Sequence, residues 1–251
     1  MVETNVIYNE DCLEGMKRIP DKSIDMILCD LPYGTTKCKW DTVIPLEPLW
    51  EQYKRLIKDN GAIVLFAQTP FDKVLGCSNL DMLRYEWIWE KTQATGHLNA
   101  NKMPLKSHEN ILVFYKKLPV YNPQKTDGHK PSNFYTKYIS TQNNTELYGC
   151  TSKEISGGGN TDRFPRSVQV FVSDKQKIHL HPTQKPVALL EYLIKTYTNE
   201  GDIVMDNCMG SGSTIVAAIN TNRKYIGFEL DKHYYDVACK RIEGVNGNKL
   251  C

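Results

Sequence analysis

The sequence lacks several features that would assign it to a special class of protein. Its 251 residues contain no apolar run close to the roughly 20 residues that cross a bilayer. They show no repeat period, which argues against a solenoid, and they hold enough aromatic and β-branched residues to argue against disorder. The opening MVETNVIYNED is polar and acidic, so we expect neither a signal peptide nor a transit peptide and predict a cytoplasmic location.

The eight cysteines also lack the spacing of a metal site, because no pair is arranged as C-x-x-C. Several lie inside apolar runs, among them Cys29 in IDMILCD and Cys208 in IVMDNCMG. We therefore expect reduced, mostly buried thiols and no bound metal.

Composition and charge are those of a globular chain, with 41% apolar and 24% charged residues. The length fits one large domain, or one domain with a sizeable insert. The net charge of +2 is unevenly distributed, since residues 116–180 hold 8 Lys and 2 Arg against 3 Asp and 2 Glu. This basic middle favours a polyanionic partner, although a solvated polar loop region would explain the charge equally well.

Apolar runs alternate with helical patterns in the first hundred residues and again after residue 168. Runs without strict polar alternation are typical of a sheet covered on both faces, so we expect parallel α/β winding. The expected strands are 5–10, 24–30, 62–67, 85–91, 110–116, 168–172, 203–206 and 225–229, and the expected helices are 12–19, 46–58, 186–197, 213–220 and 232–241. The pair Asn60-Gly61 is expected to end the second helix, and the last ten residues are expected to be loose.

The pattern breaks down between about residues 119 and 167. This segment is rich in Asn, Thr, Ser, Lys, Gly and Tyr and includes SGGGN at 156–160. So long a stretch without periodicity is typical of a functional insert or a mobile binding region. We therefore divide the chain into residues 1–118, an insert at 119–167, and residues 168–251.

A glycine-rich turn, DNCMGSGST at 206–214, follows the apolar strand IVMD and opens a helix. Glycines let the backbone approach a ligand, and the helix N-terminus presents free N–H groups. The motif matches neither the phosphate loop nor the dinucleotide fingerprint, and a plain strand-to-helix turn remains an alternative. Glu229 ends the next strand, where an acidic side chain can bind both ribose hydroxyls or simply cap a helix.

A second motif, Asp30-Leu31-Pro32-Tyr33-Gly34, follows the strand IDMILC. Ligands bind at the carboxyl ends of strands in α/β sheets. A carboxylate, a proline-stiffened turn and an aromatic ring there could hold a flat group that carries an NH₂. The alternative is an ordinary turn with Asp30 as a local cap and Tyr33 at the rim.

Together these motifs resemble those of the S-adenosylmethionine-dependent DNA amino-methyltransferases, the adenine-N6 and cytosine-N4 enzymes. DLPY differs from the family's (D/N/S)-P-P-(Y/F/W) only at its second position, and DNCMGSGST is similar to D-x-F-x-G-S-G-T. HPTQKP at 181–186, NEDCL at 9–13 and RFPRSV at 163–168 resemble further family elements. Their order is that of the permuted β arrangement, with the catalytic motif first, then a recognition region, then the cofactor motif.

The resemblance implies a Rossmann-like methyltransferase fold with S-adenosyl-L-methionine as cofactor. Residues 1–118 would be the catalytic half, 119–167 the target-recognition insert and 168–251 the cofactor-binding half. Asp30 and the Leu31 carbonyl would accept the N–H groups of the target amine, Pro32 would stiffen the turn, and Tyr33 would stack on the base. The cofactor-binding residues that it implies are Asp11, Cys12, Thr183, Lys185, Asp206, Gly210, Gly212, Thr214 and Glu229.

The implied reaction is methyl transfer to the N6 amine of an adenine flipped out of double-stranded DNA. Adenine is favoured because Asp at the first catalytic position is commoner in the adenine enzymes of the family. Cytosine-N4 methylation, a catalytically silent DNA-binding module, and methylation of RNA or protein amides are the alternatives. A homodimer and a partner restriction endonuclease are both left open by the sequence.

Overall fold

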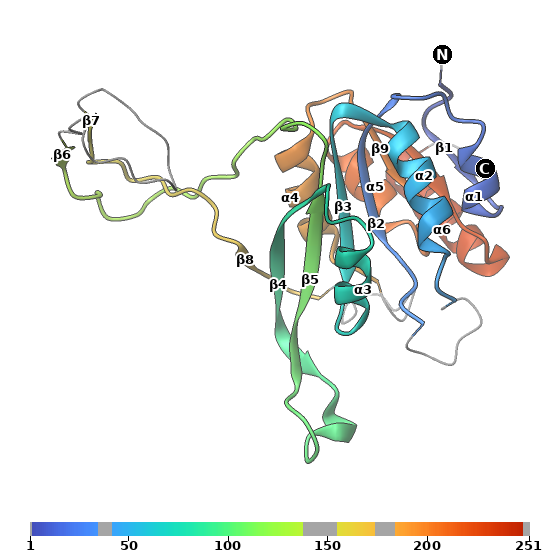
Figure 1. Cartoon of the computed structure of the whole chain (residues 1–251), viewed down its shortest axis with the longest axis horizontal. Helices are drawn as coiled ribbons and strands as arrows, with labels where there is room; N and C mark the ends of the chain where they lie inside the picture. Colours follow the sequence, from blue (N-terminus) through green and yellow to red (C-terminus); the bar gives the residue numbers. More distant parts are fainter. Residues whose placement is uncertain (1, 35–41, 138–154, 174–183, 248–251) are drawn as a thin grey trace. The chain divides into compact units, whose positions relative to one another are not determined.

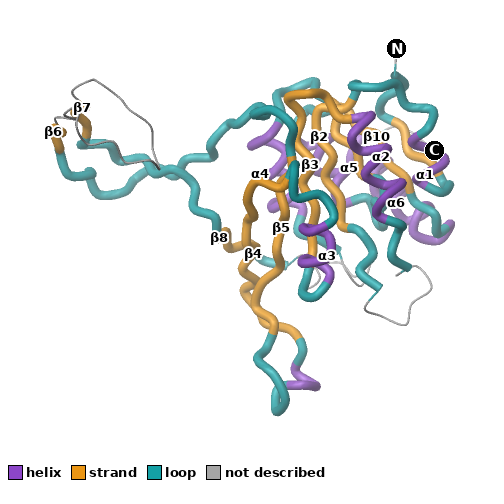
Figure 2. The backbone as a smooth tube through the Cα atoms, in the orientation of Figure 1, coloured by secondary structure: helices purple, strands orange, loops and turns teal. Residues whose placement is uncertain are grey.

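The computed structural model describes residues 2–34, 42–137, 155–173 and 184–247 (Figures 1 and 2). The chain divides into two compact units. One consists of Met1–Asn122 with Ser167–Cys251, and the other of Pro123–Arg166. The larger unit contains the main sheet, and the smaller unit contains a short hairpin.

An eight-stranded sheet in the order β1-β10-β9-β2-β3-β5-β4-β8 forms the larger unit. Its strands are β1 (Val6–Tyr8), β2 (Ile24–Asp30), β3 (Ile57–Ala67), β4 (Leu83–Thr95), β5 (Lys106–Phe114), β8 (Val168–Phe171), β9 (Ile203–Asp206) and β10 (Lys224–Phe228). The first five strands in this order run parallel, whereas β5 is antiparallel to both neighbours. β5 reverses because it follows β4 in a hairpin, whose end carries the 3₁₀ helix η1 (His97–Asn99). The expected mostly parallel α/β class is confirmed.

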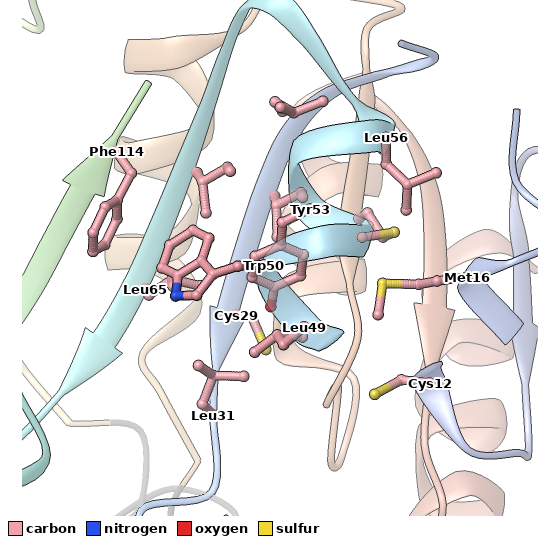
Figure 3. Close-up of a cluster of buried hydrophobic side chains, with 14 of the residues drawn as sticks. Cys12, Met16, Cys29, Leu31, Leu49, Trp50, Tyr53, Leu56, Leu65 and Phe114 are labelled. Carbon is pink, nitrogen blue, oxygen red and sulfur yellow. The ribbon is translucent and has the colours of Figure 1, made fainter. Parts of the chain in front are cut away.

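Helices cover both faces of this sheet (Figures 1 and 2). They are α1 (Cys12–Met16), α2 (Leu46–Leu56), α3 (Phe71–Cys77), α4 (Val187–Tyr197), α5 (Ser213–Asn220) and α6 (Lys232–Asn246). Alternate residues of β2 belong to different cores: Ile27 and Cys29 pack with residues of α1, α2 and α3, while Met26 and Leu28 pack with residues of α4, α5 and α6. Figure 3 shows part of the first core beside α2. Because both faces are buried, β2 reads as a continuous apolar run.

The expectation that Gly61 ends the second helix is wrong. Helix α2 ends at Leu56, and β3 begins at the next residue and passes through Gly61. A Cβ atom at Gly61 would lie 2.7 Å from the Asp25 carbonyl oxygen. The glycine is therefore needed where β3 bulges against β2 and the two backbones come close.

The C-terminal region also differs from expectation in two respects. Helix α6 continues to Asn246, because Ile242 is buried against the second core, and it ends at Gly247 in the left-handed conformation with φ of 66°. Among the described cysteines, four are free, but Cys239 is disulfide-bonded, so the expectation of reduced thiols is wrong at that position.

In the smaller unit, β6 (Tyr135–Lys137) pairs with β7 (Ile155–Gly157) in an antiparallel hairpin. The backbones of Thr126 and Arg163 exchange two hydrogen bonds of 2.8 and 3.0 Å. The Phe134 and Phe164 side chains are largely exposed. Backbone pairing thus supplies much of the order in this unit.

Two kinds of feature are absent from the described part of the chain. None of its helices combines the length and apolar character that a membrane span needs. No group of three or more His, Cys, Asp or Glu side chains there is placed to hold a metal ion.

Candidate active site

The DLPY motif leaves the carboxyl end of β2, and its first residue, Asp30, is the last residue of that strand. The Tyr33 hydroxyl donates a 2.6 Å hydrogen bond to Asp30 Oδ1. The Tyr33 ring packs on Phe71 with a centroid distance of 5.3 Å. The turn therefore folds back so that its carboxylate and its aromatic ring meet.

Leu31, which stands where the family has proline, points into the protein rather than toward solvent. Its side chain is buried in the first core, in the same cluster as Cys29 and Leu49 (Figure 3). Pro32 is half-buried. The leucine therefore anchors the turn by apolar packing, which compensates for the stiffness that a second proline would give.

Lys185, from the HPTQKP motif, lies at the DLPY turn. Its ammonium forms a short ion pair with Asp30 Oδ2 and lies 3.3 Å from Glu109 Oε2. Glu109 Oε1 is in turn 2.6 Å from the Lys91 ammonium. Asp30, Lys185, Glu109 and Lys91 thus form a row of four side chains of alternating charge that leads from the turn into the sheet.

Burial and these ion pairs have opposite effects on the pKa values of the buried groups. Burial raises the pKa of Asp30; Lys185 counteracts this rise and Glu109 adds to it, and the pKa stays above its usual value. Burial alone would lower the pKa of Lys185, but Asp30 and Glu109 outweigh it and raise that pKa. Burial alone would raise the pKa of Glu109, but the two lysines outweigh it and lower that pKa. The ion pairs therefore favour the charged forms of the lysine and Glu109.

The glycine-rich turn lies between β9 and α5. Gly210 and Gly212 have φ angles of 52° and 76°, in the left-handed region. A Cβ atom at Gly212 would lie 3.1 Å from the Ala238 Cβ, so helix α6 packs closely against the turn. The turn thus combines a backbone free of side chains with the start of a helix, as a backbone-bound ligand requires.

Asp206 ends β9 beneath this turn and is almost fully buried. Its Oδ1 accepts a 3.0 Å hydrogen bond from the Cys208 amide. Burial raises its pKa to about 6, against the effect of hydrogen bonds from Thr214 and the Cys208 amide. Asp206 and Thr214 are therefore joined inside the turn.

Glu229, directly after β10, uses both carboxylate oxygens on backbone groups. One accepts a 2.9 Å hydrogen bond from the Gly210 amide and the other a 2.8 Å bond from the Asp231 amide. Burial raises its pKa, and these amides counteract the rise. Glu229 thus fixes the glycine turn to the start of α6, and its remaining lone pairs could still accept from a ligand.

Asp11 and Cys12 begin helix α1 near the same turn. Asp11 caps the helix through a 2.8 Å bond from the Leu13 amide. The Asn207 amide nitrogen lies 3.6 Å from Cys12 Sγ and 3.4 Å from Cys208 Sγ. Cys12 therefore lies beneath the glycine turn, whereas Asp11 has a structural role as a cap. Thr183 lies outside the described residues.

The topology explains why these residues meet. β1, β10, β9 and β2 run parallel and end near Asp11, Glu229, Asp206 and Asp30, respectively. Carboxyl ends of neighbouring parallel strands share one edge of the sheet, which is the ligand-binding edge of such folds. The DLPY and glycine turns follow β2 and β9, which pair directly, and the negative charge of Asp30 contributes to the raised pKa of Asp206.

Sequence reasoning missed Lys91 and Glu109. A signal was present, because each is a charged residue at the end of an apolar run, in YEWIWEK and ENILVF. Charged residues are almost never fully buried unless they are paired. The ion pair between Lys91 and Glu109 depends on the register of β4 with β5. That register places Trp89 opposite Glu109, and Lys91 follows two residues later on the same face of β4.

The fold and these two turns are typical of α/β enzymes that bind a nucleotide-type ligand at the carboxyl edge of the sheet. Residues 24–240 match the model of the DNA methylase family of N6 and N4 enzymes, and the chain belongs to this family. The resemblance seen in the sequence is thereby confirmed.

Individual proteins show the same relationship. DNA adenine methyltransferase YhdJ from Escherichia coli (strain K12) is 28% identical over 261 residues, covering 96% of this chain and 83% of YhdJ. The structure of an M1.HpyAVI–SAM complex matches with a TM-score of 0.65 at 24% identity, covering 94% of this chain and 98% of the other. The cytosine-N4-specific PvuII DNA methyltransferase matches with a TM-score of 0.69 at 15% identity, covering 100% and 94%. These two structures show that the fold is shared.

Proposed function

We propose that this protein methylates the N6 amine of adenine in double-stranded DNA, with S-adenosyl-L-methionine as methyl donor. The observation that carries the proposal is the position of Asp30, at the end of β2 beside the glycine turn and hydrogen-bonded to Tyr33 and Lys185. Membership of the DNA methylase family supports DNA as the substrate. Because the relative YhdJ comes from a bacterium, whose DNA lies in the cytoplasm, we propose that this protein acts in the cytoplasm.

The residues of the glycine turn fit the cofactor. Gly210 and Gly212 give the turn its left-handed backbone, and Thr214 and Asp206 lie at the base of the turn. Glu229 would accept hydrogen bonds from the ribose, and Cys12 would lie near the adenine. When bound, the cofactor supplies an electrophilic methyl group on a sulfonium sulfur.

Asp30 would orient the target amine. The amine nitrogen is a poor nucleophile because its lone pair is conjugated with the ring. Hydrogen bonds to the Asp30 carboxylate and the Leu31 carbonyl would direct that lone pair toward the methyl carbon, with Tyr33 against the base. Once the amine nitrogen has accepted the methyl group, its surplus proton would pass to the Asp30 carboxylate. The raised pKa of Asp30 suits this acceptor role.

The target base must leave the duplex to reach this turn, which costs a few kcal/mol, on the order of 2–4. We propose residues 119–167 as the target-recognition region, whose basic side chains would bind the DNA backbone and repay part of this cost. The exposed Phe134 and Phe164 rings of the smaller unit are suited to contact with bases.

Adenine is favoured over cytosine because Asp30 occupies the first catalytic position and because YhdJ, at 28% identity, is an adenine methyltransferase. The deciding experiment incubates the protein with labelled S-adenosylmethionine and unmethylated genomic DNA, followed by mass spectrometry of the nucleosides. N6-methyladenine supports the proposal. N4-methylcytosine would overturn the choice of base, and no modified deoxynucleoside would overturn DNA methylation itself.

A further inference from the structure

Asp30 is the outermost member of a row of four charged side chains that continues into the sheet. Lys185 lies between Asp30 and Glu109, and Glu109 lies between Lys185 and Lys91. The four residues come from β2, from the segment before α4, from β5 and from β4, so no single element accounts for the row. Their charges cancel, which a buried group of ions requires.

The inner members are largely removed from water. The side chains of Lys185, Glu109 and Lys91 are 7%, 6% and 11% exposed, whereas that of Asp30 is 22% exposed. Burying charges carries a large desolvation cost, and well-packed apolar residues are often at least as stabilising. Stability alone is therefore a weak reason for this row, and its exposed end is the residue that would bind the target amine.

Aromatic rings restrict where the Lys185 ammonium can lie. It is 5.1 Å from the centroid of the Phe66 ring and 5.8 Å from that of Tyr33. Glu109 is fixed on the opposite side by Lys91, through a different oxygen. With rings and carboxylates around it, Lys185 is held toward Asp30 without the freedom typical of an exposed lysine.

We infer that Glu109, fixed by Lys91, is a positioning residue for methyl transfer: it holds the Lys185 ammonium beside Asp30 and thereby fixes the carboxylate that receives the target amine. This inference rests on the proposed function and adds two residues to its machinery. Neither Glu109 nor Lys91 needs to touch the base or the cofactor for this role. Misplacement of a catalytic group by about 1 Å lowers a rate by roughly 100-fold, so such support has a measurable effect.

The row also predicts a pH effect with a definite sign. The titratable groups around Asp30 are Lys185, Glu109, Tyr33, Cys29 and, from β9, Asp206. Among them, the negative charge of Glu109 raises the pKa of Asp30. Replacing Glu109 with neutral Gln removes that contribution, so the acidic limb of the rate profile should move to lower pH. Loss of packing alone would not move it.

The test compares wild type with Glu109→Gln, Glu109→Asp and, as a matched control, Lys58→Gln. Lys58 forms a 2.6 Å ion pair with Asp25 between β3 and β2, so the control removes an interstrand ion pair that lies outside the row. Single-turnover methyl transfer to unmethylated genomic DNA is measured from pH 5 to 9, cofactor affinity by calorimetry, and stability by thermal unfolding.

For Glu109→Gln we expect a transfer rate that falls by roughly 10- to 100-fold, an acidic limb displaced to lower pH, and near-normal cofactor affinity. Glu109→Asp keeps the charge and should retain the wild-type limb with a smaller loss of rate. Lys58→Gln should change neither rate nor limb. A normal rate in Glu109→Gln would overturn the inference, and so would a reduced rate with an unmoved limb, because that result indicates a purely structural role.

The substitution Glu109→Gln leaves two buried ammonium groups with one carboxylate, and this imbalance would be the cause if the variant fails to fold. The double variant Glu109→Gln/Lys91→Gln removes one charge of each sign and serves in that case, with the same expected loss of rate and the same displaced limb. Failure of the proposed function is distinguishable, since wild type itself would then methylate no DNA nucleoside.

Discussion

Lys185 donates a hydrogen bond to the Asp30 carboxylate although the two residues are 155 positions apart in the sequence. The contact joins the segment before α4 to the carboxyl end of β2. The motif that carries Lys185 therefore contributes to the turn that would hold the target amine. The resemblance implies a role for this lysine at the cofactor, and in the structure its ammonium contacts the Asp30 carboxylate.

Replacement of Asp30 with alanine is expected to lower methyl transfer by roughly 100- to 1000-fold, because it removes a preorganised acceptor from the reaction centre. Affinity for the cofactor should stay near the wild-type value, since the glycine turn that would hold the cofactor does not include Asp30. Initial rates with tritiated S-adenosylmethionine and calorimetric titration of the cofactor measure the two effects. Transfer at a near-normal rate would show that another group accepts the amine.

Replacement of Gly212 with alanine is expected to destabilise the protein by about 1–2 kcal/mol and to weaken cofactor binding, because φ is 76° there and the new Cβ would meet Ala238. Gly244 in α6 is the matched control, since a Cβ atom there meets nothing within 4 Å. Gly244→Ala should raise stability by up to about 1 kcal/mol. Urea unfolding of both variants tests the contrast, and equal effects would contradict it.

The raised pKa of Asp206 predicts that the protein loses stability as the pH rises. Its pKa is about 6 in the folded chain against an ordinary value of 3.8, so the folded state binds the proton more tightly. This contribution is fully present below pH 3.8, is lost as the pH rises through 6, and amounts to at most about 3 kcal/mol. Melting temperatures of wild type and Asp206→Asn between pH 4 and 7 measure it. The amide keeps an acceptor for the Cys208 N–H, and parallel pH curves would refute the assignment.

Leu31 is predicted to matter through its side chain as well as its carbonyl. Because the side chain is buried in the first core, Leu31→Ala should lower the free energy of unfolding by about 2–4 kcal/mol. Leu98→Ala is the control, since Leu98 is fully exposed and its loss should change stability by no more than about 0.5 kcal/mol. Chemical denaturation distinguishes the two, and a neutral Leu31→Ala would mean that the turn is held by its backbone alone.

Much of the fold follows from local sequence. The bounds of β2 and α5 are as expected, because β2 is a continuous apolar run and α5 begins after a glycine. Gly61 misled the interpretation, since glycine serves equally to end a helix and to let two strands approach closely. Only the position of the Asp25 carbonyl in the folded sheet distinguishes the two uses.

The candidate site likewise has one part that the sequence locates and another that depends on the folded structure. Asp30 and the glycine turn could be located from sequence because each occupies a short motif directly after a strand. The partners of Lys185 could not, because the contact with Glu109 depends on which strands are neighbours and in which register they pair. The capping of α1 by Asp11 is likewise a contact that the structure adds to the role implied by the resemblance.

The interleaved order of the strands has a consequence for how the chain could be divided. β9 and β10, from the C-terminal part, are inserted between β1 and β2 from the N-terminal part. A cut within residues 123–166, which form a unit of their own, would leave the catalytic turn on one fragment and the glycine turn on the other. Neither fragment could complete the sheet alone, because β9 and β10 of one fragment pair with β2 and β1 of the other. The division would therefore give a split methyltransferase, whose activity reports the meeting of two separately produced pieces.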